Sequence, residues 1–178
     1  LSGNPYAGIA DKTTWNFTAA DVIAPTVTDY SPGDNATAVP VDASLVLTFD
    51  EPVDAEAGGT IEIHETDGDG LFESFTLPSG NVTGSGTSTI TIDPTAAFAS
   101  ETGYYVLISA TAFDDASNNS YPGIAVKTTW NFTSADVIAP TVSAYSPLDN
   151  ATGVPVNADL MLTFSESVAK GTAGDIII

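Results

Sequence analysis

The sequence predicts an all-β fold: an antiparallel β-sandwich of about seven strands that recurs in tandem repeats of 115 residues. Three observations support this prediction. Short segments of alternating apolar and polar residues are separated by Gly, Pro, Asn and Asp, a pattern typical of strands joined by turns. Helical periodicity is almost absent. Long stretches of the chain also recur at a fixed offset, which is typical of repeat architectures.

The internal repeat divides the chain into three segments. Residues 20–49 align without gaps to residues 135–164, with 23 of 30 positions identical. Residues 1–19 align at the same offset to residues 116–134, with 13 of 19 identical. We interpret the segments as the C-terminal strand of one repeat, one complete repeat and the N-terminal strands of a third, at residues 1–19, 20–134 and 135–178. We expect further chain to supply the strands that the outer two segments lack.

Seven strands are predicted in the complete repeat, in chain order at residues 26–30, 44–49, 60–64, 71–77, 88–92, 103–109 and 124–133. Their side chains alternate between two faces, so one face of each strand is predicted to be buried. In the second strand Leu45, Leu47 and Phe49 share a face. In the last strand Trp130 and Phe132 share a face, and we expect this aromatic pair to anchor the core.

The charge of the chain excludes several kinds of partner. There are 23 Asp and Glu residues against three Lys and no Arg, for a formal charge of −20. Nucleic acid and anionic membrane surfaces are excluded because both bind through clustered Lys and Arg. No apolar run is long enough to insert into a membrane. Cysteine is absent, so there is no disulfide framework. The acidic side chains repel one another, which indicates a saline or calcium-containing medium.

Several short motifs carry a resemblance to a known family: Ala24-Pro25-Thr26-Val27, Ser31-Pro32, Val39-Pro40, Leu47-Thr48-Phe49, Glu51-Pro52-Val53, Tyr104-Tyr105-Val106 and Trp130-Asn131-Phe132-Thr133. With them the repeat resembles the bacterial Ig-like repeats of S-layer proteins and large surface adhesins. The resemblance implies an immunoglobulin-like sandwich and an extracellular or cell-surface location. The family usually has Asp-x-Ala-Gly-Asn before the last strand. Here the loop reads Asp114-Asp115-Ala116-Ser117-Asn118-Asn119, and Asn118 stands where the first copy has Gly3, consistent with a left-handed backbone that Asn tolerates.

Acidic loops predict a calcium site at the junctions between repeats. Successive strands reverse direction, so the linker, the loop after the second strand and the loop before the last strand lie at one end of the sandwich. Calcium binds six to eight oxygens from carboxylates, amides and backbone. The candidate ligands, including the copies in the next repeat, are Asp21, Glu51, Asp54, Asp114, Asp115, Asn119, Asp136 and Glu166. Asp21 and Glu51 are preferred because they recur as Asp136 and Glu166. The alternative is that the acids are only solvated loop residues in a salty medium.

Two further features are predicted to be structural. Residues 65–70 begin like an EF-hand loop, but Thr76 stands where a bidentate Glu would close it, so a Gly-rich hairpin turn is favoured. His64 is the single histidine and is interpreted as a half-exposed strand residue. No nucleophile or acid–base constellation can be assigned around it, so we predict that the chain is not an enzyme.

The favoured function is structural. The repeats are interpreted as spacers of a secreted bacterial surface adhesin or extracellular filament, rigidified by calcium at the junctions. The expected partners are neighbouring Ig-like repeats of the same chain, with lateral self-association of arrays into a fibre or layer as a further possibility. The alternative is a carbohydrate- or surface-binding accessory module of a secreted enzyme. Such a module would use an exposed aromatic row, for which the candidates are Tyr6, Tyr30, Tyr121 and Tyr145.

Overall fold

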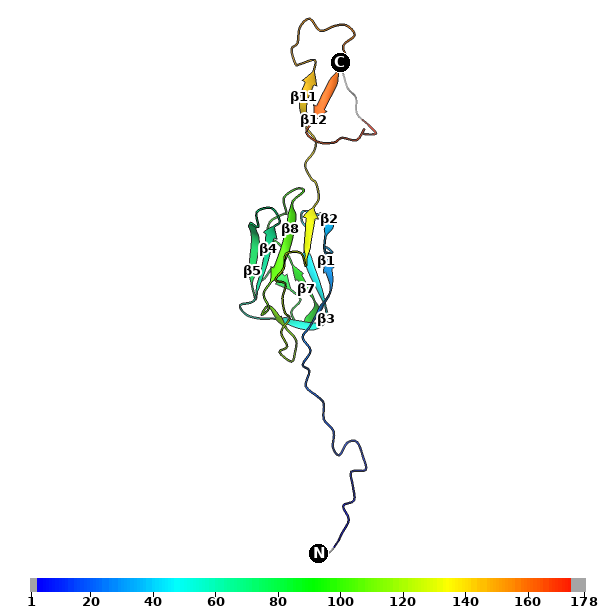
Figure 1. Ribbon diagram of the computed structural model, residues 1–178, viewed down its shortest axis with the longest axis vertical. Helices are drawn as coiled ribbons and strands as arrows, with labels where there is room; N and C mark the ends of the chain where they lie inside the picture. Colours follow the sequence, from blue (N-terminus) through cyan, green and yellow to red (C-terminus); the bar gives the residue numbers. More distant parts are fainter. Residues whose placement is uncertain (1–2, 174–178) are drawn as a thin grey trace. The chain divides into compact units, whose positions relative to one another are not determined.

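The computed structural model describes residues 3–173; the terminal parts of the two outer segments, residues 1–2 and 174–178, lie outside the described residues. The chain divides into two compact units, Leu1–Ala135 and Asp136–Ile178. Figure 1 shows the strands of both units, and every regular element in the described part of the chain is a β-strand. Those residues include no helix long and apolar enough to cross a membrane. The all-β prediction is confirmed.

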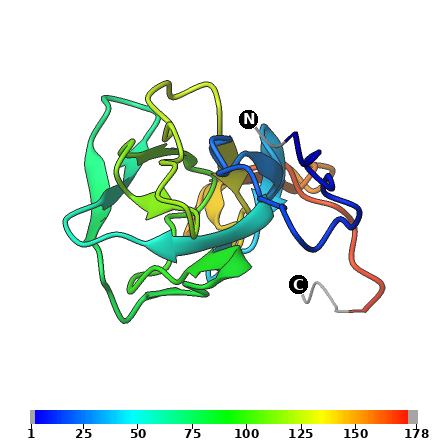
Figure 2. The ribbon, with the colours of Figure 1, turned by 90° about the horizontal axis from the view of Figure 1, so that it is seen from below.

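The first unit contains a sandwich of two sheets. Its strands are β1 (Val27–Ser31), β2 (Ala36–Val39), β3 (Leu45–Ala55), β4 (Thr60–Glu65), β5 (Leu71–Thr76), β6 (Val82–Thr83), β7 (Thr87–Ile92), β8 (Gly103–Ile108), β9 (Phe113–Asp114) and β10 (Asn131–Ser134). One sheet has the order β1-β3-β7-β6, with β9 paired to β3, and the other has the order β2-β10-β8-β4-β5. Seen along the long axis in Figure 2, the two sheets enclose the core.

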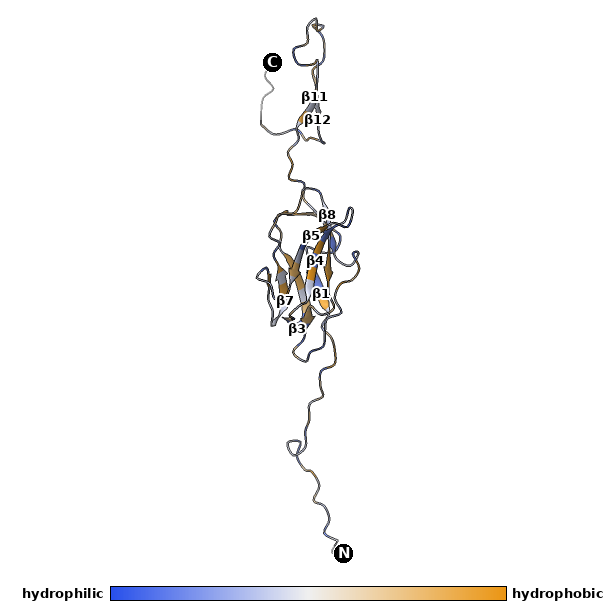
Figure 3. Cartoon of the chain, turned by 90° about the vertical axis from the view of Figure 1, so that its left-hand side faces the viewer, coloured by the Kyte–Doolittle hydropathy of each residue, from blue (hydrophilic) through white to orange (hydrophobic). Residues whose placement is uncertain are grey.

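The core consists of the residues that the alternating pattern places on the inner faces. Leu45, Leu47 and Phe49 of β3 are buried, as predicted. Trp130 and Phe132 are 0% and 2% exposed, and the intervening Asn131 is only partly buried. Figure 3 shows the hydrophobic colour concentrated on the strands of this sandwich. Burial of each apolar side chain stabilises the folded state by about 1.5–3 kcal/mol. The face of each strand that carries the apolar side chains therefore turns toward the core.

The structure differs from the predicted strands in four ways. The predicted last strand, residues 124–133, is regular only over β10, because Ile124 makes a single bridge to Ile108 and a turn follows it. β3 continues to Ala55, so the acids expected in a loop after it lie on a strand. β10 runs parallel to β2, so the sandwich is not wholly antiparallel. The short strands β2, β6 and β9 were not predicted, because two to four residues carry too little alternation to be recognised.

The second unit contains one antiparallel pair, β11 (Val142–Ser146) and β12 (Met161–Phe164). Val142 pairs with Phe164 and Ser146 pairs with Met161. Both pairs follow the corresponding pairs of β1 and β3 by 115 residues, and the irregularity between them recurs at the same place. The sequence repeat is therefore accompanied by the same local pairing.

We expect residues 20–134 to fold alone and residues 135–178 not to. The first segment has a closed core, whereas the apolar side chains Val156, Leu160 and Met161 of the second are exposed. A two-stranded pair is marginally stable in water. Urea titrations of the two separate segments, followed by circular dichroism, test this expectation. A cooperative unfolding transition of residues 135–178 alone would contradict it.

Candidate metal centre

A clamp fastens the start of β1 to β3. The backbone N–H and the hydroxyl of Thr26 donate to the two carboxylate oxygens of Asp50, at 2.8 Å and 2.8 Å. These hydrogen bonds hold the pKa of Asp50 below its ordinary value. In the second unit Ser165 stands in place of Asp50, and its side chain accepts a single hydrogen bond, from the Thr141 N–H to Ser165 Oγ at 3.0 Å. The segment before β1 is therefore fixed beside Glu51, the residue that follows Asp50.

A tight turn after β9 positions Asp115. Its Oδ1 accepts the backbone N–H groups of Ser117 and Asn119, both at 2.8 Å, and its Oδ2 accepts the side-chain amide of Asn119 at 2.8 Å. Asn118, inside this turn, has a φ of 63°, the left-handed backbone that was predicted for the position where the first copy has Gly3. The hydrogen bonds lower the pKa of Asp115, most strongly the one from the Asn119 side chain. These hydrogen bonds orient the Asp115 carboxylate and favour its charged form.

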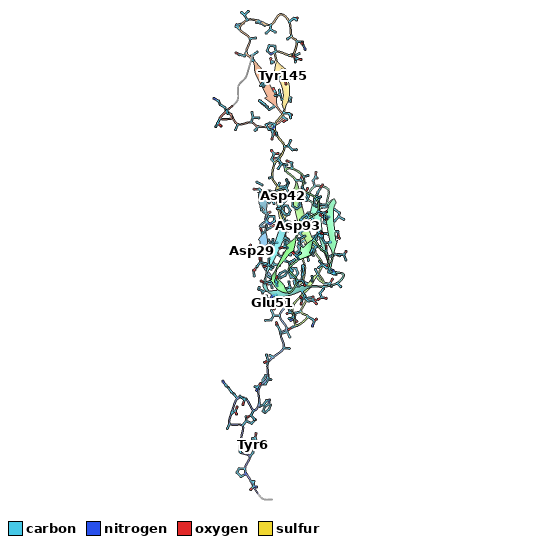
Figure 4. The ribbon with its side chains drawn as sticks, turned by 180° about the vertical axis from the view of Figure 1, so that it is seen from behind. Tyr6, Asp29, Asp42, Glu51, Asp93 and Tyr145 are labelled. Atoms are coloured by element: carbon cyan, nitrogen blue, oxygen red, sulfur yellow. The ribbon has the colours of Figure 1, made fainter. Side chains whose placement is uncertain are left out.

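Three carboxylates converge at this end of the sandwich. One oxygen each of Asp21, Glu51 and Asp115 lie within 4.8 Å of one another. Asp21 comes from the segment before β1, where its Oδ1 accepts the Ile23 N–H at 3.0 Å. Glu51 comes from β3, and Figure 4 shows it at one end of the sandwich. Sequence positions 21, 51 and 115 are thus brought together by the clamp and by the turn after β9.

The cluster repels its own charge. The pKa of Glu51 lies above its ordinary value of 4.5, first because partial burial desolvates the carboxylate and then because Asp115, Asp21 and Asp50 repel it. A cation at this point would cancel that repulsion. The three residues offer hard oxygen ligands with no His or Cys, which matches the preference of calcium.

The other predicted ligands lie around this cluster or in the second unit. Asp54 and Asp114 face each other in the β3–β9 ladder, where Asp114 Oδ1 is buried and has no hydrogen-bond partner in the described chain. Asn119 donates its side-chain N–H to Asp115, so its side-chain oxygen is the atom that could still bind a metal. Asp136 and Glu166 belong to the second unit, where Asp136 Oδ1 accepts the Ile138 N–H at 2.9 Å as Asp21 accepts that of Ile23.

A family model described as a bacterial Ig-like domain matches residues 21–134 and 136–178. The chain belongs to this family. The resemblance predicted from the motifs is therefore confirmed at the level of the family. No curated protein matches the sequence.

Two solved structures are similar to part of this Ig-like chain. CopC from Methylosinus trichosporium OB3b is 13% identical, with a TM-score of 0.41 over 65% of this chain and 97% of that chain. Domains 1–6 of the surface layer protein SbsC are 18% identical, with a TM-score of 0.43 over 68% of this chain and 15% of that chain.

Glu51→Gln gives the Ig-like sandwich an expected change in pH dependence when no divalent ion is present. The folded protein binds a proton at Glu51 more tightly than the unfolded chain does, so Glu51 adds stability as the pH falls through its raised pKa. At a pH above both pKa values Glu51 is charged in the folded and in the unfolded chain, and the repulsion is present in the folded one. We therefore expect the variant to be more stable than the wild type at pH 7 in EDTA, and the difference to vanish below the ordinary pKa. Urea unfolding at a series of pH values measures it. A variant less stable than the wild type at pH 7 would contradict this.

The hairpin turn and His64 have structural roles, as predicted. Residues 66–70 connect β4 to β5, and the Glu65 N–H donates to the Gly70 carbonyl at 2.8 Å. Asp69 in this turn accepts hydrogen bonds from Lys127 Nζ at 2.8 Å and from the Tyr105 hydroxyl at 3.1 Å. The His64 ring stacks on Tyr105 at 5.1 Å. Asp69 is thus already paired with the Lys127 cation at the exposed surface of the Ig-like sandwich.

Proposed function

We propose that this chain is a structural spacer of a secreted bacterial surface adhesin or extracellular filament, in which calcium at the junctions between Ig-like repeats limits bending. The observation that carries the proposal is the convergence of Asp21, from the linker, with Glu51 and Asp115, from the sandwich. An ion bound by all three would tie a linker to a domain. Such a bond acts on the angle between neighbouring repeats, which is the property that a spacer must control.

The ligand set favours a weak site filled at extracellular calcium concentrations. Asp115 already accepts three hydrogen bonds, so it retains little capacity beyond one bond to a metal. Glu51 and Asp21 supply the other carboxylates, and water and backbone oxygens complete the six to eight that calcium takes. Calcium sites of extracellular modules have dissociation constants of about 10⁻⁴–10⁻³ M. A secreted protein meets calcium in that range.

The exposed aromatic row that a carbohydrate-binding module would need does not form in the sandwich. Tyr121 is 5% exposed and its ring packs edge-on against Phe49, with centroids 5.2 Å apart. Tyr30 packs against Trp130, with centroids 5.0 Å apart. Two of the four candidate tyrosines therefore pack against the core, which favours the spacer over the binding module.

The proposal is tested with a protein of two consecutive copies of residues 20–134. Small-angle X-ray scattering in EDTA and then in about 10 mM calcium, at constant ionic strength, reports its maximum dimension and flexibility. We expect calcium to lengthen and stiffen the two-domain protein and sodium to have no such effect. Equal scattering profiles in EDTA and calcium would overturn the proposed role of the junctions.

A further inference from the structure

The linker between the two units leaves the central sandwich at a fixed point. The Ala135 N–H donates to the Val39 carbonyl at 2.7 Å, and the Ala135 carbonyl accepts the Glu101 N–H at 3.2 Å. Ser134, just before it, is 3% exposed, and its hydroxyl accepts the Thr102 N–H at 2.9 Å. The backbone is therefore held by the central sandwich as far as Ala135.

The next point of attachment lies at the start of the following repeat. In the central sandwich this point is the clamp of Thr26 on Asp50, and Pro25, immediately before it, is buried. Thr141 is the counterpart of Thr26 in the second unit, where its N–H makes one side-chain hydrogen bond. The linker between the two points of attachment is therefore short and consists of residues 136–140.

The first half of the linker closes a turn on itself. Asp136 Oδ1 accepts the Ile138 N–H at 2.9 Å, and in the linker before the central sandwich Asp21 Oδ1 accepts the Ile23 N–H at 3.0 Å. A bond from an Asp side chain to the N–H two residues later, called an Asx turn, restricts the backbone that it spans. The two linkers are identical in sequence. The same linker sequence thus forms the same turn twice.

Proline restricts the second half of the linker. The ring of Pro140 fixes its own φ and favours an extended backbone at Ala139 before it. Ala24 and Pro25 repeat this pair in the other linker. A flexible tether would be rich in Gly and Ser, and residues 136–140 contain neither. Local restraints therefore cover the linker from its Asp to its Pro.

We propose that the linker is a stiff joint set by its own sequence, in which an oxygen of Asp21 or Asp136 holds an Asx turn that limits bending before any ion is bound. The Asp acts here as a positioning residue. The turn needs an acceptor oxygen at this place, and Asn offers one as Asp does. The inference rests on the proposed spacer role but does not require calcium, because an ion would act on a joint that is already restricted.

Two consecutive copies of residues 20–134 test the proposal, because each copy has its own closed core and the second linker then lies between complete sandwiches. In that linker Asp21→Ala removes the acceptor oxygen and Asp21→Asn keeps it, while both remove the same charge. Nitrogen-15 relaxation in EDTA and about 0.5 M NaCl, which screens the acids, measures the order of the backbone. For the amides of Val22 and Ile23 we expect order parameters of about 0.85 in the wild type and in Asp21→Asn, and below about 0.6 in Asp21→Ala.

Small-angle X-ray scattering of the same proteins gives a second readout. Asp21→Ala should have a shorter mean length and a broader distribution of lengths than the wild type, and Asp21→Asn should match the wild type. Val22→Ala is the control, because it removes an exposed side chain from the turn and leaves the hydrogen bond to Asp21 in place. In the full chain the same pair of substitutions at Asp136 should change the order of the Ile138 amide in the same way.

Three results would overturn the proposal: a wild-type linker with order parameters below about 0.6 in EDTA, an Asp21→Ala linker as ordered as the wild type, or an Asp21→Asn linker as disordered as that of Asp21→Ala. The calcium hypothesis is tested separately. Asp21→Asn should lose the response to calcium while its linker stays ordered in EDTA, so a failed calcium test leaves this inference standing.

Discussion

Trp130→Ala is expected to lower the free energy of unfolding of the central sandwich by about 3–5 kcal/mol, the usual cost of emptying a large aromatic site in a core. Trp130 is fully buried, packs on Tyr30 with centroids 5.0 Å apart, and uses its only polar atom in the bond to Pro32. Alanine leaves a cavity between the sheets and an unpaired carbonyl. Urea unfolding of residues 20–134, followed by circular dichroism, measures the change.

Two neighbouring substitutions serve as controls. Val126→Ala removes an exposed side chain from the same segment and should change stability by less than about 0.5 kcal/mol. Asn131→Ala removes a partly exposed hydrogen bond to Asp34 and should cost about 1 kcal/mol. A loss of less than about 1 kcal/mol in Trp130→Ala would mean that the indole does not support this core.

Calcium is expected to stabilise the sandwich by about 2.7 kcal/mol when its free concentration is about 100 times the dissociation constant of one site. An ion held by Asp21, Glu51 and Asp115 would favour the folded chain, where these residues are gathered, over the unfolded chain, where they are far apart. Differential scanning calorimetry of the full chain in EDTA and in calcium measures the shift. Sodium at equal ionic strength screens the charges without gathering the ligands, so its effect should be much smaller.

Substitutions separate binding from general charge effects. Asp21→Asn and Glu51→Gln each remove one ligand charge and should abolish most of the calcium-dependent stabilisation. Asp42→Asn removes the same charge at the other end of the sandwich, as Figure 4 shows, and should leave the response to calcium unchanged. If all three variants respond to calcium as the wild type does, the acids at this end of the sandwich do not bind the ion.

Alternation within strands was the most informative part of the sequence. Leu45, Leu47 and Phe49 turn inward because burial of apolar side chains favours one face, and that preference is local. The extent of the last predicted strand was wrong. Residues 125–130 have strand-like composition, but the pairing of Ile124 with Ile108 and of Asn131 with Tyr105 leaves a turn between them. Pairing depends on distant residues, which a local pattern does not contain.

Part of the candidate site was likewise predictable from the sequence, and part was visible only in the tertiary structure. From strand reversal, the sequence by itself predicted that carboxylates from the linker, the loop after the second strand and the loop before the last strand lie at one end. It also determined the 115-residue copies Asp136 and Glu166. Only the tertiary structure decided which acids meet. Both carboxylate oxygens of Asp50 accept hydrogen bonds from Thr26, and the turn after β9 places Asp115, and not Asp114, in the group with Asp21 and Glu51. Which acidic side chains lie close together depends on hydrogen bonds between residues far apart in sequence. These bonds fix the directions of the side chains, which the order of the strands does not specify.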